Sequence, residues 1–409
     1  MECINNEKNL LLGGSAQQII AIEAAKRLGY YTVLCDYLTD NPGRYLADKF
    51  YLRSTTDKET ILNIAKEERV DGVVAYASEP AALTSAYVSE NLGLPGNPYK
   101  SVEILCNKDK FREFLTIHGF FTPKARSYGA VEAAFDDING DIFQSSVIVK
   151  PVDSSGSKGV SRIKKGESQN AIVQKLENAM DYSRRKCIIV EEFVEKYGYQ
   201  IAGDGLSVNG RLVFRCFGND HFDIHAPNPF VPVAASFPYN MPDIVQEKIH
   251  LEIQRLLTLL GMKTCTYNFD LRIDKDYNVY LMEVAPRNGG NYIPQVIQYA
   301  TGVDLVECAI KAAMGEDLSY ITSGIQKGFW SYYAVHSNYG GILEQVVLGD
   351  SVRQNNIVDN YIKKKKGDEM NAFTGAGDTL GCLIMKFESM NQMLEMMDNS
   401  NKWIKVRRK

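Results

Sequence analysis

Two lysines and a glycine-rich segment are the first residues whose types and spacing could do chemistry. Lys108 begins a predicted helix over 107–118, and Lys150 ends a β-branched strand over 147–150. A lysine within a buried strand needs an anionic partner, because burying an unpaired charge is costly. Segment 153–160 follows at once, and its glycines and serines let backbone amides and hydroxyls approach an anion. The pattern fits a phosphate-binding loop and, about equally well, a flexible hairpin turn.

Two carboxylates could hold a cation. Asp270 and Glu283 lie on the two strands of a predicted hairpin, 269–273 and 279–284, and Arg287 follows four residues after Glu283. Facing carboxylates repel each other unless a cation or an arginine lies between them. Carboxylate oxygens, phosphate oxygens and water are the usual ligands of Mg²⁺ in proteins. The spacing favours a magnesium site over a surface salt bridge.

The segment Glu191-Glu192-Phe193-Val194 follows a predicted strand over 187–190. Such a strand end could offer backbone N–H and C=O groups to the edge of an adenine, with apolar walls from Phe193 and Val194. Taken alone, the segment is better interpreted as an edge strand with exposed acids.

Other candidates are weaker. The turn Gly13-Gly14-Ser15 joins a strand to a helix, and Asp36 ends the next strand, as in a dinucleotide site. The Gly-x-Gly-x-x-Gly spacing is missing, so a structural turn is favoured. His221 and His225 are interpreted as polar loop residues rather than metal ligands.

The elements that must position these residues differ along the chain. The first hundred residues alternate strands and helices, which predicts a doubly wound parallel sheet. The middle contains two predicted hairpins, one around Asn209-Gly210 and one over 269–284, and a long helix over 242–260. Short strands after residue 329 predict a small α/β cap.

Composition limits the function classes. The chain has 409 residues, 45% of them apolar, which predicts two or three globular domains and excludes wholesale disorder. With 46 Lys and Arg against 50 Asp and Glu, a nucleic-acid partner is not expected. Eight cysteines without a Cys-x-x-Cys pair, no leader pattern over 1–7 and no apolar run of roughly 20 residues predict a cytoplasmic protein that binds no membrane.

In their order and spacing these pieces resemble the ATP-grasp superfamily over about residues 1–330. Arg287-Asn288-Gly289-Gly290, with Ile293-Pro294 and Thr301-Gly302-Val303-Asp304, is most similar to its L-amino-acid ligase branch. The resemblance implies α/β and α+β architecture in three domains. These are a pre-ATP-grasp domain with the doubly wound parallel sheet (1–100), a two-lobed ATP-grasp domain with a mobile small lobe at about 123–191 (101–327), and a small C-terminal α/β cap (328–409).

The resemblance also implies ATP and Mg²⁺ (or Mn²⁺) as cofactors. It implies catalytic roles for Arg287 and Lys150, with the metal on Asp270 and Glu283. The residues implied to bind ATP are Lys108 and Lys150 at the phosphates, Ser155, Gly156, Ser157, Gly159 and Val160 in the mobile loop, Glu191, Glu192, Phe193 and Val194 at the adenine, and Gln200 at the ribose.

Two positions depart from the family pattern. Ala285 stands where the family has a metal-binding Asn, so Asn268 or Asn288 is a candidate replacement. Gln200 stands where the family has a ribose-binding Glu, and its amide can still hydrogen-bond hydroxyls.

The implied function is an ATP-dependent carboxylate–amine ligase. It would form an amide from a small-molecule carboxylate and an amine through an acyl phosphate, and release ADP and phosphate. One alternative is a carbamoyl-phosphate-synthase-like or biotin-carboxylase-like enzyme that phosphorylates bicarbonate. Others are an ATP-binding module without turnover and an NAD-dependent dehydrogenase. The sequence does not determine the oligomeric state, although homodimers are common among the proteins that it resembles.

Overall fold

The computed structural model describes residues 7–140 and 142–409. The expectation about a leader, and Cys3, lie outside the described part of the chain. The seven cysteines within it are all free. No described helix is both long and apolar enough to span a membrane.

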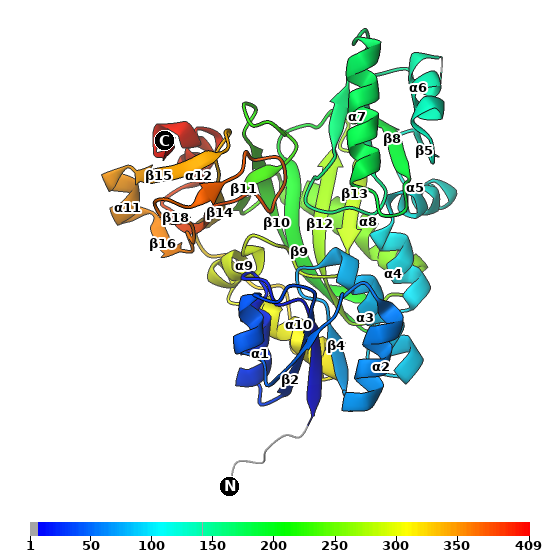
Figure 1. Ribbon diagram of the computed structural model, residues 1–409, viewed down its shortest axis with the longest axis vertical. Coiled ribbons are helices and arrows are strands. Elements are labelled where there is room, and N and C mark those ends of the chain that lie inside the picture. The colour runs from blue at the N-terminus through cyan, green and yellow to red at the C-terminus, as the bar shows by residue number, and fades with distance from the viewer. Residues whose placement is uncertain (1–6, 141) are drawn as a thin grey trace.

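The N-terminal unit is a four-stranded parallel sheet in the order β3-β2-β1-β4 (Figure 1). Strands β1, β2 and β4 bury side chains on both faces, as a parallel sheet covered by helices requires. In β1, Leu10 and Leu12 belong to the apolar cluster that includes α2 and α3, whereas Leu11 belongs to the cluster that includes α1. The predicted doubly wound sheet is confirmed. Its elements are β1 (Lys8–Leu12), α1 (Ile19–Arg27), β2 (Tyr31–Asp36), η1 (Pro42–Tyr45), β3 (Lys49–Leu52), α2 (Lys58–Glu68), β4 (Gly72–Val74) and α3 (Glu79–Leu92).

A helix from much later in the chain completes the cover of this sheet. Val306 and Ile310 of α10 (Leu305–Met314) pack in the same apolar cluster as Leu11, and Figure 1 shows α10 beside α1 and β4. Gly72 permits the approach, since a Cβ there would lie 2.4 Å from the carbonyl oxygen of Ala313. The N-terminal sheet is therefore tied to the centre of the molecule.

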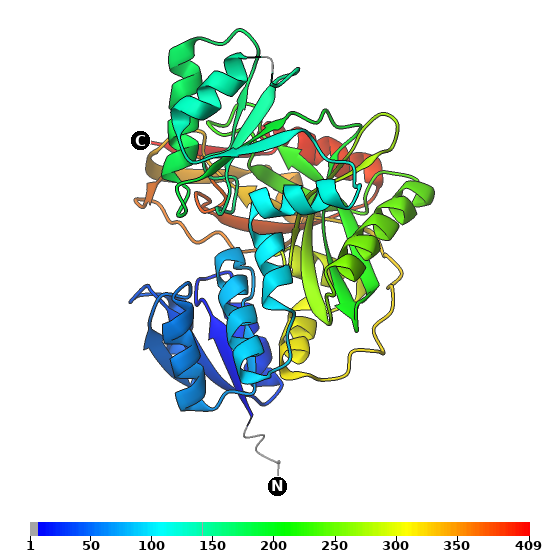
Figure 2. The ribbon, with the colours of Figure 1, turned by 90° about the vertical axis from the view of Figure 1, so that its right-hand side faces the viewer.

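Two helices, α4 and α5, lead to a separate four-stranded sheet in the order β5-β8-β6-β7, seen at the top of Figure 2. Its pairings are antiparallel, and α6 and α7 pack on its apolar face. The elements are α4 (Tyr99–Cys106), α5 (Lys108–Ile117), β5 (Ala125–Tyr128), α6 (Val131–Asn139), β6 (Val147–Pro151), β7 (Ser161–Ile163), α7 (Gln169–Asp181) and β8 (Ile188–Glu192).

The centre is an eight-stranded sheet in the order β13-β12-β9-β10-β11-β14-β18-β16. Both predicted hairpins occur in it, and the turn between β9 and β10 has Asn209 at φ 51° and Gly210 at φ 83°, as a type I′ turn requires. Helix α8 packs on one face and α9 on the other. The elements are β9 (Gln200–Val208), β10 (Arg211–Phe222), β11 (Pro232–Phe237), α8 (Asp243–Leu259), β12 (Cys265–Ile273), β13 (Val279–Ala285) and α9 (Ile293–Thr301).

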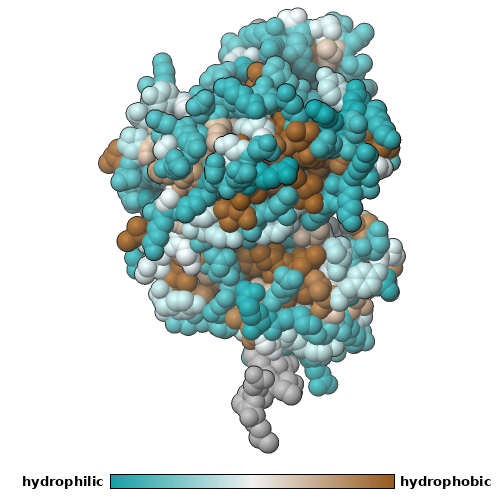
Figure 3. All heavy atoms as spheres, turned by 90° about the vertical axis from the view of Figure 1, so that its left-hand side faces the viewer, coloured by the Kyte–Doolittle hydropathy of each residue, from teal (hydrophilic) through white to brown (hydrophobic). Residues whose placement is uncertain are grey.

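The C-terminal segment continues this sheet. Strands β14, β18 and β16 extend it beyond β11, and β17, β15 and β19 form a separate small sheet. A domain boundary at residue 328 therefore cuts through a continuous sheet. Figure 3 shows the face of the molecule that lies on the left in Figure 1, where apolar residues gather across the middle, between hydrophilic surfaces above and below. The elements are β14 (Phe329–Val335), β15 (Gly341–Leu348), α11 (Asp350–Asn355), β16 (Ile357–Asn360), β17 (Glu369–Met370), β18 (Gly381–Phe387), α12 (Met390–Asp398), η2 (Ser400–Lys402) and β19 (Ile404–Arg408).

Replacing Phe214 by Ala tests how far the molecule depends on this shared sheet. Phe214 is 1% exposed on β10 and packs in the cluster that includes α9 and strands from both halves of the sheet. A cavity there should lower the free energy of unfolding by about 3–5 kcal/mol, measured by urea denaturation. The control Ile244→Ala removes a side chain that is 78% exposed and should leave the unfolding midpoint nearly unchanged. Equal midpoints for the two variants would contradict the packing.

Candidate functional site

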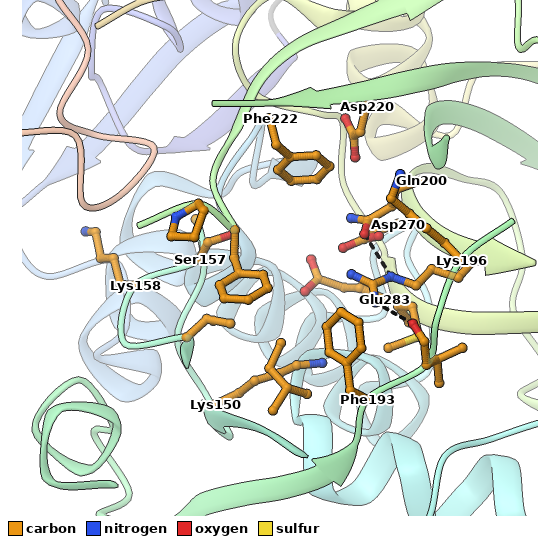
Figure 4. A pocket seen from close by; sticks show the side chains of 18 of the residues that line it. Lys150, Ser157, Lys158, Phe193, Lys196, Gln200, Asp220, Phe222, Asp270 and Glu283 are labelled. Atoms are coloured by element: carbon orange, nitrogen blue, oxygen red, sulfur yellow. Dashed lines mark hydrogen bonds between the residues drawn. The ribbon is translucent and has the colours of Figure 1, made fainter. Parts of the chain in front are cut away.

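A cleft of about 400 Å³ lies between the sheet of β5–β8 and the central sheet (Figure 4). It brings together most of the residues singled out from the sequence, although they span more than 170 positions. Those that line it are Lys108, Lys150, Ser155, Gly156, Ser157, Val160, Glu192, Phe193, Val194, Gln200, Asp270 and Glu283. Arg287 lines an adjoining cavity, and Gly159 and Glu191 line neither.

Lys108 lies where α5 begins, and its backbone N–H donates to the carbonyl of Val152. Its Nζ is 2.8 Å from the carbonyl oxygen of Ser154 and 3.5 Å from Oε2 of Glu283. Burial acts to lower the pKa of Lys108, but the carboxylates of Glu283 and Glu79 outweigh it and raise the pKa. The ammonium group therefore stays charged where the glycine-rich loop begins.

Lys150 belongs to a buried charge network. Its Nζ is 2.7 Å from Oε2 of Glu191, whose other oxygen accepts from Nε of Arg112 at 2.8 Å. Arg112 also donates to the carbonyls of Leu281 and Met282 on β13. Burial acts to raise the pKa of Glu191, but the two cations lower it to about 2. The fully buried Glu191 thus pairs with Lys150 and Arg112 inside the protein, and it does not line the cleft.

Asp270 and Glu283 lie directly opposite each other on β12 and β13, as the sequence pattern predicts. Burial, and then the charge of Glu283, raise the pKa of Asp270 to about 6, although Arg272 opposes this. Oδ1 of Asp270 is buried and has no hydrogen-bond partner among the described residues. Figure 4 shows both carboxylates pointing into the cleft. An unpaired buried carboxylate oxygen beside a second carboxylate is an arrangement that a cation would relieve.

Arg287 sits beyond these carboxylates. Its NH2 is 3.6 Å from Oε1 of Glu283 and 3.7 Å from Oε2 of Glu79, while NH1 donates to Oδ1 of Asn268 at 2.9 Å. Glu79 opens α3 of the N-terminal unit, and burial followed by the charge of Glu283 raises its pKa to about 7. The N-terminal unit therefore contributes a carboxylate to the site.

The two asparagines considered as replacements at Ala285 differ in position. Asn268 is paired with Ala285 across the strands, and its amide already bonds Arg287 and Asp204. Asn288 is buried away from the cleft, where it bonds Thr266 and the carbonyl of Leu305.

The glycine-rich loop meets the C-terminal segment. The carbonyl of Gly156 accepts from the backbone N–H of Ala376 at 3.1 Å. The carbonyl of Ser157 accepts from Nδ2 of Asn228, which also donates to Thr374. Gly156, Ser157 and Gly159 have φ between 57° and 71°, the left-handed region that favours glycine. The loop is thus a tight turn that its glycines permit, and it is bonded to the C-terminal segment on the far side of the cleft.

The predicted adenine segment has an arrangement the sequence did not indicate. The guanidinium carbon of Arg162 lies 3.8 Å from the ring centre of Phe193, and that of Arg272 lies 5.0 Å from it. Arg272 also donates to the carbonyl of Val194 and to Oε1 of Gln200, at 2.8 Å each (dashed in Figure 4). One arginine therefore orders both the adenine segment and the predicted ribose residue.

A second cavity, of about 490 Å³, adjoins the cleft on the far side of the carboxylates. Asp220, Asp270 and Glu283 line both spaces. The second cavity is also lined by Ser15 and Gln17 of the N-terminal unit, together with Glu79, Arg287, Asn291 and Tyr332. The carboxylates thus lie between the cleft and the second cavity, and a different molecule could occupy each.

The Gly13-Gly14-Ser15 turn is closed by its own surroundings. The N–H of Gly14 donates to Oδ2 of Asp36 at 2.7 Å, and a Cβ at Gly13 would meet the side chain of Gln18. A carboxylate thus occupies the place an anionic ligand would need. The interpretation as a structural turn is supported.

Residues 143–295 match the family model of the ATP-grasp domain. The chain contains an ATP-grasp domain. Its match begins just before β6 and ends in α9, so it includes Lys150, the adenine segment, both carboxylates and Arg287. Lys108 and Glu79 lie N-terminal to the match.

The fold is shared along nearly the whole chain. The structure is similar to the crystal structure of an L-amino acid ligase from Bacillus licheniformis, with a TM-score of 0.81, 20% identity and 99% of each chain covered. In sequence, the chain is 25% identical to the carbamoyl phosphate synthase large chain of Thermoplasma acidophilum over 325 residues, 76% of this chain and 30% of that one. It is 27% identical to the protein y4rH of Sinorhizobium fredii over 307 residues, 72% of this chain and 61% of that one. The chain thus spans less than two thirds of these two relatives.

Several residues of the site carry no sequence signal. Glu79, Arg112 and Asp220 are single charged residues in otherwise ordinary segments, and only distant partners give them a role. A buried charge at an amphipathic helix position, as at Arg112 in α5, is the one hint. His221 is not a loop residue as expected, because β10 extends to Phe222 and buries it.

Glu191→Gln should lower the free energy of unfolding near pH 7 by about 3–5 kcal/mol, because it leaves Arg112 and Lys150 buried without their counter-charge. The pKa of Glu191 is about 2 in the fold against 4.5 for a free glutamate. Its contribution is therefore complete above pH 4.5 and is lost as the pH falls toward 2.

Urea denaturation of the wild type and of Glu191→Gln between pH 3 and 7 measures the difference in their free energies of unfolding. The exposed pair partner Glu195 provides the control, since Glu195→Gln should change stability little at any pH. A Glu191→Gln deficit that does not shrink with acidification would contradict the assignment.

Proposed function

We propose that the chain is an ATP-dependent carboxylate–amine ligase that forms an amide through an acyl phosphate and releases ADP and phosphate. The observation that carries the proposal is the convergence of Lys108, Lys150, Asp270, Glu283 and Arg287 around one cleft and its adjoining cavity. The ATP-grasp match and the similarity to an L-amino acid ligase support it.

In this proposal the two lysines offset the negative charge on the phosphate oxygens of ATP. Lys108 is 14% exposed and Lys150 11% at the side chain, so both charges act in a poorly hydrated site where electrostatic interactions are strong. Glu191 and Arg112 hold Lys150 in place from behind. Because the lysines are fixed before the nucleotide arrives, little reorganisation is needed in the reaction.

Asp270 and Glu283 would hold Mg²⁺ (or Mn²⁺), which supplies charge neutralisation at the β- and γ-phosphates. The unpartnered Oδ1 of Asp270 fits such an ion. Within the described residues no group of three or more His, Cys, Asp or Glu could hold a metal. The remaining ligands would therefore be phosphate oxygens and water, which is how Mg²⁺ usually binds.

Arg287 is placed to act on the substrate side. It lines the second cavity, next to Glu283 and Glu79. The substrate carboxylate would attack the γ-phosphorus from this cavity, and the guanidinium would stabilise the charge on the transferred group. The amine would then displace phosphate from the acyl phosphate, with no protein nucleophile required.

The loop over 153–160 would keep water from the acyl phosphate. Ser155, Gly156, Ser157 and Lys158 line both the cleft and the second cavity. Its bonds to Asn228 and Ala376 hold it on the side of the C-terminal segment. Water excluded from a closed site cannot hydrolyse the activated intermediate.

Bicarbonate phosphorylation is the second candidate, favoured by the similarity to a carbamoyl phosphate synthase large chain. The second cavity, at about 490 Å³, is far larger than bicarbonate requires and favours an organic acid. A coupled assay of ADP release over amino acids, small acids and bicarbonate separates the two. We expect release to need an organic carboxylate together with an amine, and release with bicarbonate alone would select the second candidate.

Glu283→Gln should reduce ADP release at least about 100-fold, because it removes one metal ligand charge and weakens the field on the phosphates. The amide keeps the size of the side chain, so the circular dichroism spectrum and melting temperature should change little. Glu247→Gln on α8, an exposed residue paired with Arg215, is the matched control and should retain full activity. Undiminished ADP release by a folded Glu283→Gln enzyme would contradict the metal assignment. A wild-type protein that binds ATP without any turnover would favour the binding-module alternative.

A further inference from the structure

One carboxylate of the cleft comes from the C-terminal segment. Asp398 is the last residue of α12, and its side chain, 44% exposed, lines the same cleft as Lys150 and Phe193. Nδ1 of His221 is 2.6 Å from its Oδ1, and the hydroxyl of Tyr199 donates to its Oδ2 at 2.6 Å. Tyr199 directly precedes β9, and His221 lies on the neighbouring strand β10. The two residues thus hold this carboxylate in one orientation.

Hydrogen-bond counting assigns the donors. Oδ1 of Asp398 only accepts as a carboxylate oxygen, so Nδ1 of His221 is the donor between them, and Nε2 of a neutral ring accepts from the hydroxyl of Ser236. The neutral imidazole then carries its proton on Nδ1 and donates to Asp398. Burial lowers the pKa of His221, in agreement with a neutral ring. Burial acts to raise the pKa of Asp398, but the bonds from His221 and Tyr199 outweigh it and lower the pKa. Asp398 is therefore an ionised acceptor with lone pairs left over on both oxygens.

The position of Asp398 is unfavourable for the helix that carries it. A negative charge at the C-terminal end of a helix meets the negative end of the macrodipole. Three strand-side groups offset this at Asp398: His221, Tyr199 and the nearby charge of Lys196. The remaining lone pairs of the carboxylate have no hydrogen-bond partner among the described residues, and the side chain is exposed to the cleft. The arrangement is therefore suited to a ligand that donates hydrogen bonds.

The residue expected at the ribose has its acceptor oxygen in use, because Oε1 of Gln200 accepts from Nε of Arg272 at 2.8 Å. The other carboxylates that line the cleft are Asp220, Asp270 and Glu283, which lie toward the second cavity, and Glu192, which accepts from the N–H of Gln144. Asp398 is the oriented carboxylate on the side of Lys196 and Tyr199, which follow the adenine segment directly.

We propose that Asp398 accepts hydrogen bonds from the ribose hydroxyls of the bound nucleotide, so that the C-terminal segment completes the nucleotide site. The inference rests on the proposed function, because it requires a nucleotide in the cleft. The ribose 2′- and 3′-hydroxyls are the donors of a nucleotide that lie between its adenine and its phosphates. The adenine segment and the two lysines bound the same stretch of the cleft. His221 and Tyr199 are positioning residues that aim the carboxylate.

The test is isothermal titration calorimetry of the full chain with Mg²⁺ and ADP, 2′-deoxy-ADP or 3′-deoxy-ADP, which bind without turnover. The wild-type protein should bind at least one deoxy analogue roughly tenfold or more weakly than ADP, because a hydrogen bond to a charged acceptor is lost. Asp398→Asn should bind ADP roughly tenfold more weakly and bind the deoxy analogues with nearly the same affinity as ADP. The control Glu395→Gln makes the same change one turn earlier on α12, at a side chain that is 73% exposed, and should behave as wild type.

Discrimination retained by Asp398→Asn, or absent from a wild-type protein that binds ADP, would overturn the inference and leave the proposed function standing. A wild-type protein that binds neither ADP nor ATP would overturn both. Should Asp398→Asn fail to fold by circular dichroism, Tyr199→Phe decides the question. It keeps the carboxylate but releases Oδ2, and should reduce the discrimination about threefold, whereas unchanged discrimination would again overturn the inference.

Discussion

The neutralisation of buried carboxylates by buried cations is the interaction on which the rest of the structure depends. Glu191 is fully buried between Lys150 and Arg112, and Glu283 lies between Lys108 and Arg287. Each of these charges would be costly alone in a poorly hydrated interior. Paired, they join α5, β6, β8 and β13 at one point, and they leave the ammonium groups of the two lysines at the wall of the cleft.

The compensation is incomplete where chemistry is expected. Burial raises the pKa of Asp270 to about 6 and that of Glu79 to about 7, and Oδ1 of Asp270 has no partner in the described part of the chain. A fold that satisfies Glu191 with two cations but leaves Asp270 unsatisfied is prepared for an additional positive charge. Clusters of perturbed carboxylates of this kind are typical of functional sites.

The sheets explain why residues so far apart in the chain can meet. The central sheet runs from β13 through β9 and β10 to β14, β18 and β16, so the wall of the cleft and the C-terminal segment belong to one continuous sheet. Helix α10 ties the same layer to the N-terminal sheet, which brings Glu79 to Arg287. The cleft and the second cavity together are consequently built from all parts of the chain, although the ATP-grasp match itself covers 143–295.

The sequence by itself determined local features: the alternating strands and helices of the first hundred residues, the turn at Asn209-Gly210, and the opposition of Asp270 and Glu283. Each of these follows from periodicity, turn chemistry or hairpin register, which involve residues close in the chain. Only the tertiary structure decided that Glu191 is a buried partner of Lys150, that Arg272 engages Gln200, and that Asp398 reaches the cleft. Those contacts join residues between 41 and 199 positions apart. No local pattern encodes them, because they depend on how strands order themselves across a sheet and on which charges must find a partner once buried.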